Sequence, residues 1–203
     1  VKAALTETLT GKKIAFVQEP KDEMEKISVQ SSWAEQDPNH WWKIVCIAIK
    51  KLLQKSGVDA SQVQRIGIAY QMHGLVVVDQ SGECLRNSII WCDSRAVSIG
   101  EKAYQDLGAK KCMDHLLNSP ANFTASKLKW VKENEPHIYE KIHKYMLPGD
   151  YIAYKFSGEM TTTINGLSEG TIWDFKSQEV AQWLFDYYNI DSSMTPTIVP
   201  NFV

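Results

Sequence analysis

The order of apolar segments along this chain of 203 residues predicts an α/β or α+β fold with a mixed β-sheet. Short strand-like runs fill most of the first third, one strand followed by a helix-like stretch lies in the middle, and helical periodicity dominates the remainder. Apolar residues make up 44% of the sequence. A chain of this length and composition can bury a sizeable core in one large domain, or in one domain with a subdomain.

The N-terminal segment has the pattern of a hairpin followed by a third strand. Residues 1–6 form an apolar run that ends at a turn through Thr10 and Gly11, and residues 13–18 can return as the second arm of the hairpin. Residues 27–33 alternate between apolar and polar side chains often enough to predict another strand.

A long helix is predicted to follow these strands. Asp37 is a good N-cap, Pro38 suits the first helical position, and Gly57 ends the helical pattern. Between them, an apolar stripe at helical spacing is made by Trp42, Val45, Ile49, Leu52 and Leu53.

The middle of the chain returns to strands. Residues 64–69 are short and rich in isoleucine, residues 75–79 form a second apolar run, and residues 84–91 form a third. The segment 80–83 contains Gly82 and reads as the turn between the last two.

The rest of the chain is predicted to be mostly helical. Helices are expected at residues 94–108, 124–132, 136–142, 148–158 and 181–188. Thr124 is expected to cap the second of these, and Lys127 in its first turn to face solvent or a loop carbonyl. Residues 144–147 read as a strand, and residues 196–200 as a linker-like exit.

Charge and apolar patterning exclude several classes of partner. The chain has 22 basic and 24 acidic residues, a net charge of −2, and neither sign forms a block. This balance argues against nucleic acid or an anionic membrane as the main partner. Apolar runs are too short to span a bilayer and the first residues lack the layout of a signal peptide, so we expect a cytoplasmic protein.

The cysteine pattern gives no sign of a metal site. Cys46, Cys84, Cys92 and Cys112 are scattered without Cys-x-x-Cys spacing. Structural zinc is therefore not expected, and four unpaired thiols suit a reducing compartment.

Polar residues follow two of the predicted strands. The run QMHG at residues 71–74 follows the strand at 64–69, and the run WCDSR at 91–95 follows the strand at 84–91. In open α/β sheets, ligand sites form outside the carboxyl ends of strands. An imidazole can donate and accept hydrogen bonds, and a glycine lets backbone approach a ligand. These runs predict a site for a small hydroxylated molecule.

These two runs resemble the sugar-side domain of the FGGY family of carbohydrate kinases, and within it the xylulokinase branch. Three further runs fit the family in the same order: WAEQDPNHWW at 33–42, NFTASKLKW at 122–130 and LPGDY at 147–151. The resemblance therefore covers nearly the whole chain, and five ordered motifs are far more specific than any one of them.

The resemblance implies a ribonuclease-H-like, actin-like ATPase domain with a mixed β-sheet flanked by helices. It implies a role in the ATP-dependent phosphorylation of a sugar hydroxyl, with D-xylulose converted to D-xylulose 5-phosphate as first choice. ATP and Mg²⁺ would be the cofactors of the full-length protein, and a small-molecule sugar its partner.

Two parts of the family pattern are missing from this sequence. Family members begin with a strand followed by Asp-x-Gly-Thr-Ser, which contacts the phosphates of ATP, and they carry a second domain with the adenine pocket and the catalytic Asp. Residues 1–203 are therefore expected to be the N-terminal sugar-binding domain without its first strand and phosphate loop. We expect no catalytic, cofactor-binding or metal-binding residue in this chain and no turnover by it alone. The sheet edge left without its first strand could favour a homodimer.

Seven residues are candidates for sugar binding by resemblance: Gln71, Met72, His73, Gly74, Trp91, Asp93 and Arg95. The Met-His pair would supply hydrogen bonds to sugar hydroxyls, the glycine would keep the approach clear, and the tryptophan would form an apolar wall. The aspartate and arginine could reach a hydroxyl or pair with each other.

Each candidate also has a structural alternative. His73 could be a satisfied structural histidine and Trp91 could be partly core. Asp93 could cap the helix that follows and pair with Arg95, and Gln71 could serve only to hold its loop.

Departures from the family pattern leave the substrate open. Tyr70 stands where xylulokinases commonly have glycine, Cys92 stands where they commonly have asparagine, and residues 162–171 replace a stretch that usually carries aspartates. Ribulose, another ketose or a polyol is an alternative substrate. A sugar-binding module without catalysis is the alternative of a different class, because the sequence has no Gly-rich nucleotide loop.

Overall fold

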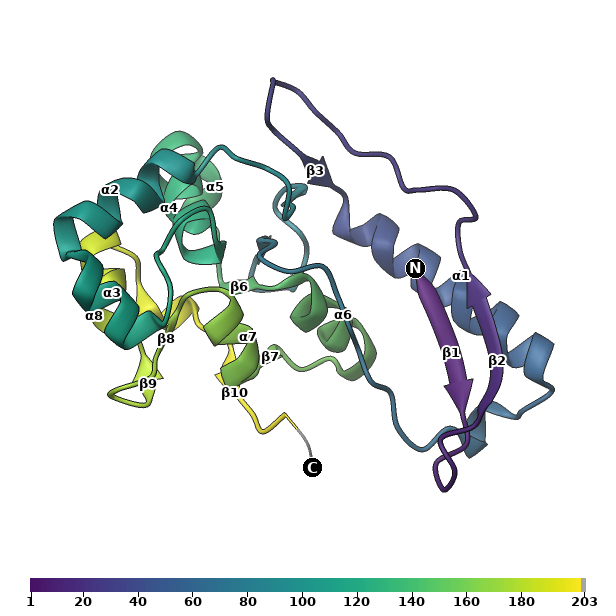
Figure 1. Cartoon of the computed structure of the whole chain (residues 1–203). Coiled ribbons are helices and arrows are strands. Elements are labelled where there is room, and N and C mark those ends of the chain that lie inside the picture. The colour runs from purple at the N-terminus through teal and green to yellow at the C-terminus, as the bar shows by residue number, and fades with distance from the viewer. Residues whose placement is uncertain (202–203) are drawn as a thin grey trace.

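The computed structural model describes residues 1–201. The β1–β2 hairpin and helix α1 lie at one end of the molecule, helices α2 to α5 and α8 lie at the other, and β6 and α6 lie between them (Figure 1). The first half of the chain contains β1 (Lys2–Thr6), β2 (Lys13–Gln18), β3 (Glu35–Gln36), α1 (Pro38–Ser56), η1 (Ala60–Gln62), β4 (Val76–Val78) and β5 (Ser88–Ile89).

The second half is mainly helical, as its sequence predicts. It contains α2 (Val97–Leu107), α3 (Ala109–Leu116), α4 (Thr124–Asn134), α5 (Pro136–Tyr139), β6 (Lys144–Met146), α6 (Pro148–Ser157), β7 (Thr161–Thr162), α7 (Ile164–Glu169), β8 (Trp173–Asp174), β9 (Glu179–Val180), α8 (Gln182–Tyr188), η2 (Ser192–Met194) and β10 (Thr197–Ile198).

Local signals set the hairpin and the first helix. β1 and β2 pair antiparallel, and α1 packs against both. The Asp37 side chain caps α1 by accepting the Asn39 N–H at 2.9 Å, and Gly57 ends the helix in the left-handed conformation at φ 68°. Both predictions are confirmed.

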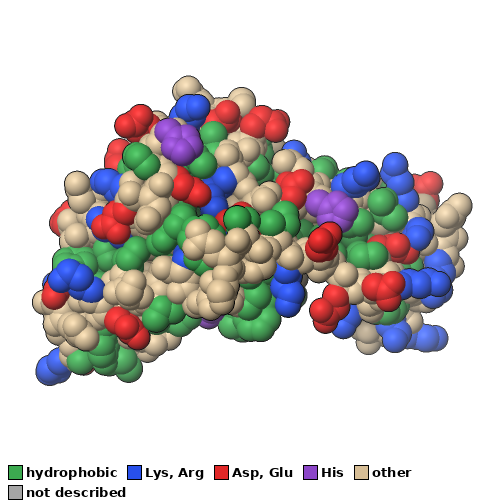
Figure 2. All heavy atoms as spheres, turned by 90° about the horizontal axis from the view of Figure 1, so that it is seen from above, with side chains coloured by type: hydrophobic (Ala, Val, Ile, Leu, Met, Phe, Trp, Pro, Cys, Tyr) green, Lys and Arg blue, Asp and Glu red, His purple; other side chains and the backbone are tan. Residues whose placement is uncertain are grey.

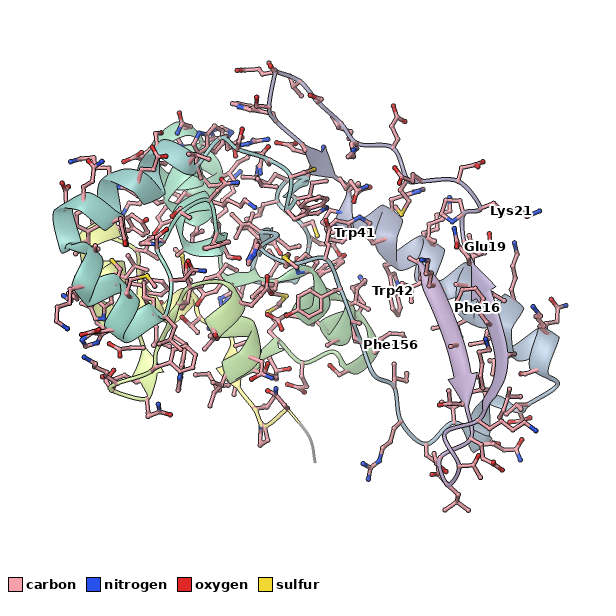
Figure 3. All side chains as sticks on the ribbon, in the orientation of Figure 1. Phe16, Glu19, Lys21, Trp41, Trp42 and Phe156 are labelled. Atoms are coloured by element: carbon pink, nitrogen blue, oxygen red, sulfur yellow. The ribbon has the colours of Figure 1, made fainter. Side chains whose placement is uncertain are left out.

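Helix α1 joins the hairpin to the middle of the molecule. Trp42 of α1 and Phe156 of α6 meet edge to face, with ring centroids 5.0 Å apart (Figure 3). Trp41 is buried in a cluster with Val76 and Met146 from the central strands. Helix α1 therefore links the hairpin to the central strands.

The central strands are short and completely buried. β4 pairs antiparallel with β6, and all three β4 valines have no exposed surface. β3 pairs with β5, and a bridge between Leu75 and Ile89 brings the second pair beside the first. The larger core cluster lies between these strands and α2, α4 and α8. Within residues 1–201 the strands pair two by two, with antiparallel and parallel pairs both present.

Four strand and loop predictions are corrected. Residues 27–33 form no strand, because they are almost wholly exposed and Ser32 turns the chain at φ 67°; only Ile27 makes a bridge, to Glu35. Residues 64–69 have no regular secondary structure and no strand partner within residues 1–201. Of residues 84–91, only β5 is a strand, and residues 196–200 contain β10, which pairs parallel with β7.

The surface charge is mixed, and the helices are not of a membrane-spanning kind among residues 1–201. Figure 2 shows basic and acidic side chains interspersed, in keeping with the small net charge. Among residues 1–201, no helix has both the length and the apolar character needed to cross a membrane.

Candidate functional site

The two candidate loops meet on one buried ammonium group. Lys127 Nζ donates to the His73 carbonyl at 2.6 Å and to the Ile90 carbonyl at 3.1 Å. The first carbonyl belongs to the loop at 71–74 and the second directly precedes Trp91. The strand-end loops that the sequence singles out therefore lie side by side, held by the first turns of α4.

His73 is held by contacts with Glu169, Lys127 and Phe123. Its backbone lies in the left-handed region at φ 58°, and its N–H donates to the Glu169 carboxylate. Ring Nδ1 lies 3.0 Å from the Glu169 carbonyl and 3.1 Å from its Oε1, and the ring packs on Phe123 with centroids 4.0 Å apart. Both Nδ1 neighbours are acceptors, so Nδ1 carries the hydrogen and Nε2 remains for a ligand.

Three of the seven candidates present side chains at the surface. Met72 is 55% exposed, Trp91 is 58% exposed, and the side chain of His73 is 22% exposed. The alternative that Trp91 packs into the core is therefore wrong. An exposed thioether, imidazole and indole on adjoining loops can contact both the hydroxyls and the carbon chain of a sugar.

Gln71 and Gly74 serve the fold. The Gln71 side chain donates to Gln36 Oε1 at 3.4 Å, which ties its loop to β3. A Cβ at Gly74 would lie 2.5 Å from Pro148 Cγ, so the missing side chain makes room for the start of α6. The expectation that Gly74 clears a path for the ligand is corrected, because Pro148 fills that space.

The side chains of Asp93 and Arg95 do not reach the surface. They are 0% and 1% exposed, and they form a two-pronged pair in which Nη2 to Oδ2 is 2.7 Å and Nε lies 3.0 Å from both oxygens. Asp93 also accepts the Ala34 N–H at 2.6 Å. The expectation that these two residues contact a hydroxyl is corrected, because their polar atoms are used inside the fold.

A larger ion network surrounds this pair. Arg95 Nη1 lies 2.7 Å from Glu35 Oε1, and the Arg95 guanidinium lies 3.9 Å from the centroid of the Trp33 ring and 4.8 Å from that of Trp130. Arg86 joins the network by pairing with Glu35 and with a glutamate at the end of α4. The network connects three of the sequence motifs under the candidate site.

Sequence reasoning identified one of the two residues that hold His73 only in part and missed the other. The sequence predicts that Lys127 faces solvent or a loop carbonyl. Burial excludes solvent, and its bonds to the His73 and Ile90 carbonyls confirm the second alternative. Its spacing offered a signal, since Thr124, Trp130 and Val131 on the same helical face are buried. Glu169 had no such signal, because it lies 96 residues from its partner.

Burial changes the acid–base properties around the site. Burial lowers the pKa of Lys127 to about 8, opposed by the nearby charge of Asp93. Burial also raises the pKa of Asp150 to about 6, although this carboxylate accepts the Leu147 N–H and the Thr162 hydroxyl. Burial, with help from Glu169 and Asp150, raises the pKa of Tyr70.

Two further features lie outside the candidate loops. An open hollow of about 660 Å³ is lined by Trp173, Val180, Ile198 and neighbouring polar residues, and includes none of the seven candidates. Across residues 1–201, no group of three or more His, Cys, Asp or Glu side chains could hold a metal ion.

Comparison with known proteins places this architecture among sugar kinases. The model of the N-terminal domain of the FGGY family of carbohydrate kinases matches residues 1–201. A xylulose kinase from Staphylococcus xylosus is 32% identical over 171 residues, which are 84% of this chain and 35% of that protein. The chain thus spans about a third of the length of the curated relatives that it matches.

Solved structures agree in fold. The structure of a xyloylose kinase from Brucella ovis has a TM-score of 0.88 at 26% identity, covering 98% of this chain and 40% of that one. A gluconate kinase from Lactobacillus acidophilus has a TM-score of 0.85 at 26% identity, covering 98% and 39%. The expected fold class is confirmed by these likenesses.

Proposed function

The chain belongs to the FGGY family of carbohydrate kinases, and on this premise we propose that it is the sugar-binding part of an ATP-dependent sugar kinase. The observation that carries the proposal is the exposure of Met72, His73 and Trp91 on two segments that Lys127 joins, and we call these three residues the sugar surface. A sugar kinase must hold one hydroxyl still while phosphate is transferred to it. Two rigidly joined loops with polar and apolar groups suit that task.

Each residue of the sugar surface has a distinct part in binding. His73 Nε2 exchanges a hydrogen bond with a sugar hydroxyl, because Nδ1 is occupied by Glu169. Trp91 covers the carbon chain, and Met72 adds a flexible apolar contact. A ligand without the matching hydroxyl would leave Nε2 unpaired, which gives the site selectivity.

D-xylulose is the proposed substrate, and D-xylulose 5-phosphate the product. The support is that several curated relatives are xylulose kinases, one of them 32% identical over most of this chain. Gluconate is the second candidate, because a gluconate kinase structure matches this chain as well as a xylulose kinase structure does. Ribulose, another ketose and polyols are the remaining candidate substrates.

The nucleotide is proposed to bind outside this chain. The sequence contains no Gly-rich phosphate loop, so its residues do not fit ATP and we assign none of them to the nucleotide or to Mg²⁺. No step of phosphate transfer is therefore derived from the residues present. Catalysis belongs to a further domain of the full-length protein.

A further strand is proposed to lie between β1 and residues 64–69. This segment runs from η1 towards β4, with no strand partner within residues 1–201 (Figure 1). Ile66 is 58% exposed, and a Cβ at Gly67 would meet nothing within 4 Å. An apolar segment with free backbone groups suits pairing with another strand.

A coupled ADP-release assay on the full-length protein tests the proposal. The panel is D-xylulose, D-ribulose, L-xylulose, L-fuculose, gluconate and glycerol, with residues 1–203 alone as the blank. We expect turnover to be dominated by D-xylulose and the blank to be silent. If gluconate were turned over fastest, gluconate would replace D-xylulose as the proposed substrate. If the protein bound ATP but phosphorylated no sugar, the kinase proposal would give way to that of a sugar-binding module without catalysis.

The variant His73→Ala tests the site itself. We expect kcat/KM for the preferred sugar to fall at least about tenfold, because a hydrogen bond to the ligand is lost. His143→Ala is the matched control, since His143 is exposed and only its backbone N–H bonds to another element. An unchanged kcat/KM in His73→Ala would remove this residue from the site.

A further inference from the structure

His73 of the sugar surface is bonded to two oppositely charged side chains from distant parts of the chain. Glu169, at the end of α7, accepts the backbone N–H of His73 and lies against ring Nδ1. Lys127, from α4, donates to the backbone carbonyl of the same residue at 2.6 Å. Both backbone polar groups and one ring nitrogen of His73 are thus bound by two charged residues.

This arrangement holds a backbone conformation that histidine seldom adopts. A residue with a side chain at φ 58° is uncommon and needs surrounding structure to keep it there. The two charged side chains supply hydrogen bonds stronger than neutral ones. Without them, the loop can relax and turn the ring away.

Lys127 also binds the segment that leads into the second loop, residues 91–95. Its ammonium also donates to the Ile90 carbonyl at 3.1 Å, immediately before Trp91. One buried cation therefore ties the backbone of the residue that carries the imidazole to the segment that directly precedes the indole. Lys127 itself is 0% exposed, so it cannot touch a ligand on that surface.

We propose that Glu169 and Lys127 are positioning residues that set the affinity for the sugar through His73 and Trp91 without contacting the sugar. The inference rests on the proposed function and deepens it. The alternative for Glu169 is direct contact, because its Oε2 is buried without a hydrogen-bond partner among residues 1–201. The experiment must separate these two roles.

A double-mutant cycle in the full-length protein makes the separation. The variants are Glu169→Ala, His73→Ala and the double variant, measured by KM and kcat for the preferred sugar and by KM for ATP. If Glu169 acts through His73, Glu169→Ala raises the sugar KM about tenfold in the wild type and has little further effect in His73→Ala. Glu169→Gln, which keeps an acceptor oxygen, should restore most of the affinity.

Lys127→Met and Ser168→Ala complete the set. Lys127→Met should raise the sugar KM while KM for ATP stays within about twofold. Ser168→Ala is the control on α7, because Ser168 adjoins Glu169 and its side chain is not bonded to His73. If Glu169→Ala raised the sugar KM by the same factor with and without His73, the two effects would be additive. That result would overturn the positioning role and favour direct contact between Glu169 and the sugar.

Hydrogen exchange separates this inference from the proposed function. The His73 amide donates to Glu169, so its exchange should be faster in Glu169→Ala and near wild type in Glu169→Gln. Unchanged exchange in Glu169→Ala overturns the inference, whether or not any sugar is phosphorylated. If the wild-type protein bound no sugar, the proposed function would be wrong. The exchange measurement would still test whether Glu169 holds the His73 amide.

Discussion

Replacing Arg95 by methionine removes the cation at the centre of the buried ion network. Methionine keeps much of the side-chain length against the Trp33 and Trp130 rings but has no charge. Asp93 loses its two-pronged partner, and Glu35 loses one of its two arginines.

The structure sets the size of the expected loss. Removing one partner of a buried ion pair destabilises a protein by about 3–5 kcal/mol, because the remaining charge stays buried. Asp93 keeps the Ala34 N–H and Glu35 keeps Arg86, so we expect the lower half of that range. For a domain of this size, about 3 kcal/mol lowers Tm by roughly 6–12 °C.

Thermal unfolding of the full-length protein, followed by tryptophan fluorescence and calorimetry, measures the loss. Trp33 and Trp130 lie on the guanidinium, so the native fluorescence should change as well. Lys141→Met is the matched control, because Lys141 is exposed, and its effect should stay within about 0.5 kcal/mol. The folded fraction of Arg95→Met should bind the sugar as the wild type does, so apparent affinity should fall only in proportion to the fraction of unfolded protein.

The opposite result would refute the reasoning. If Arg95→Met lost less than about 1 kcal/mol of stability and also lost sugar binding, Arg95 would be a ligand residue. The double variant with Asp93→Asn gives an independent check. It should be more stable than the sum of the two single losses predicts, because it leaves no unpaired buried carboxylate.

Three further predictions concern the same region. Trp91→Ala should raise the sugar KM about tenfold or more while changing the free energy of unfolding by less than about 1 kcal/mol, since the side chain is 58% exposed; kinetics and thermal unfolding check both parts. Gly74→Ala should destabilise by about 1–3 kcal/mol in thermal unfolding, because its Cβ would lie 2.5 Å from Pro148 Cγ, and wild-type stability would contradict this. The free energy of unfolding should rise by up to about 3 kcal/mol between pH 8 and pH 10, because the Lys127 pKa is lowered from 10.5 to about 8 and the unfolded chain binds the extra proton in that range. Lys127→Met should lack this rise in denaturant titrations at several pH values, and an identical pH profile would exclude Lys127 as its source.

Features with local causes could be predicted from the sequence. The start and end of α1 depend on Asp37, Pro38 and Gly57, and α6 depends on Pro148 and Gly158, all within the helices or next to them. The runs that contain the sugar surface were also identified, because they follow apolar segments. Only the run at 91–95 follows a strand in the structure, β5, whereas the run at 71–74 precedes β4.

Features that depend on distant partners could not be predicted. The sequence left open whether Asp93 and Arg95 bind a ligand or each other, and only burial among Trp33, Trp130 and Glu35 decides it. The strand predicted at 64–69 had the right composition. It forms no ladder here because a strand is defined by its neighbour, which composition does not supply.

The long reach of the contacts around His73 has a consequence for the order of synthesis. The N–H of His73 binds the carboxylate of Glu169, which is 96 residues further along the chain, and its carbonyl binds the ammonium of Lys127, which is 54 residues further along. Neither bond can form until its partner has been synthesised. At ordinary translation speeds of about 5–20 residues per second, the loop leaves the ribosome roughly 5–20 s before Glu169 does. During that interval, nascent chains carry the apolar Met72 and Trp91 without the contacts that order them. A chaperone that recognises exposed apolar loops would therefore meet this region before a sugar could.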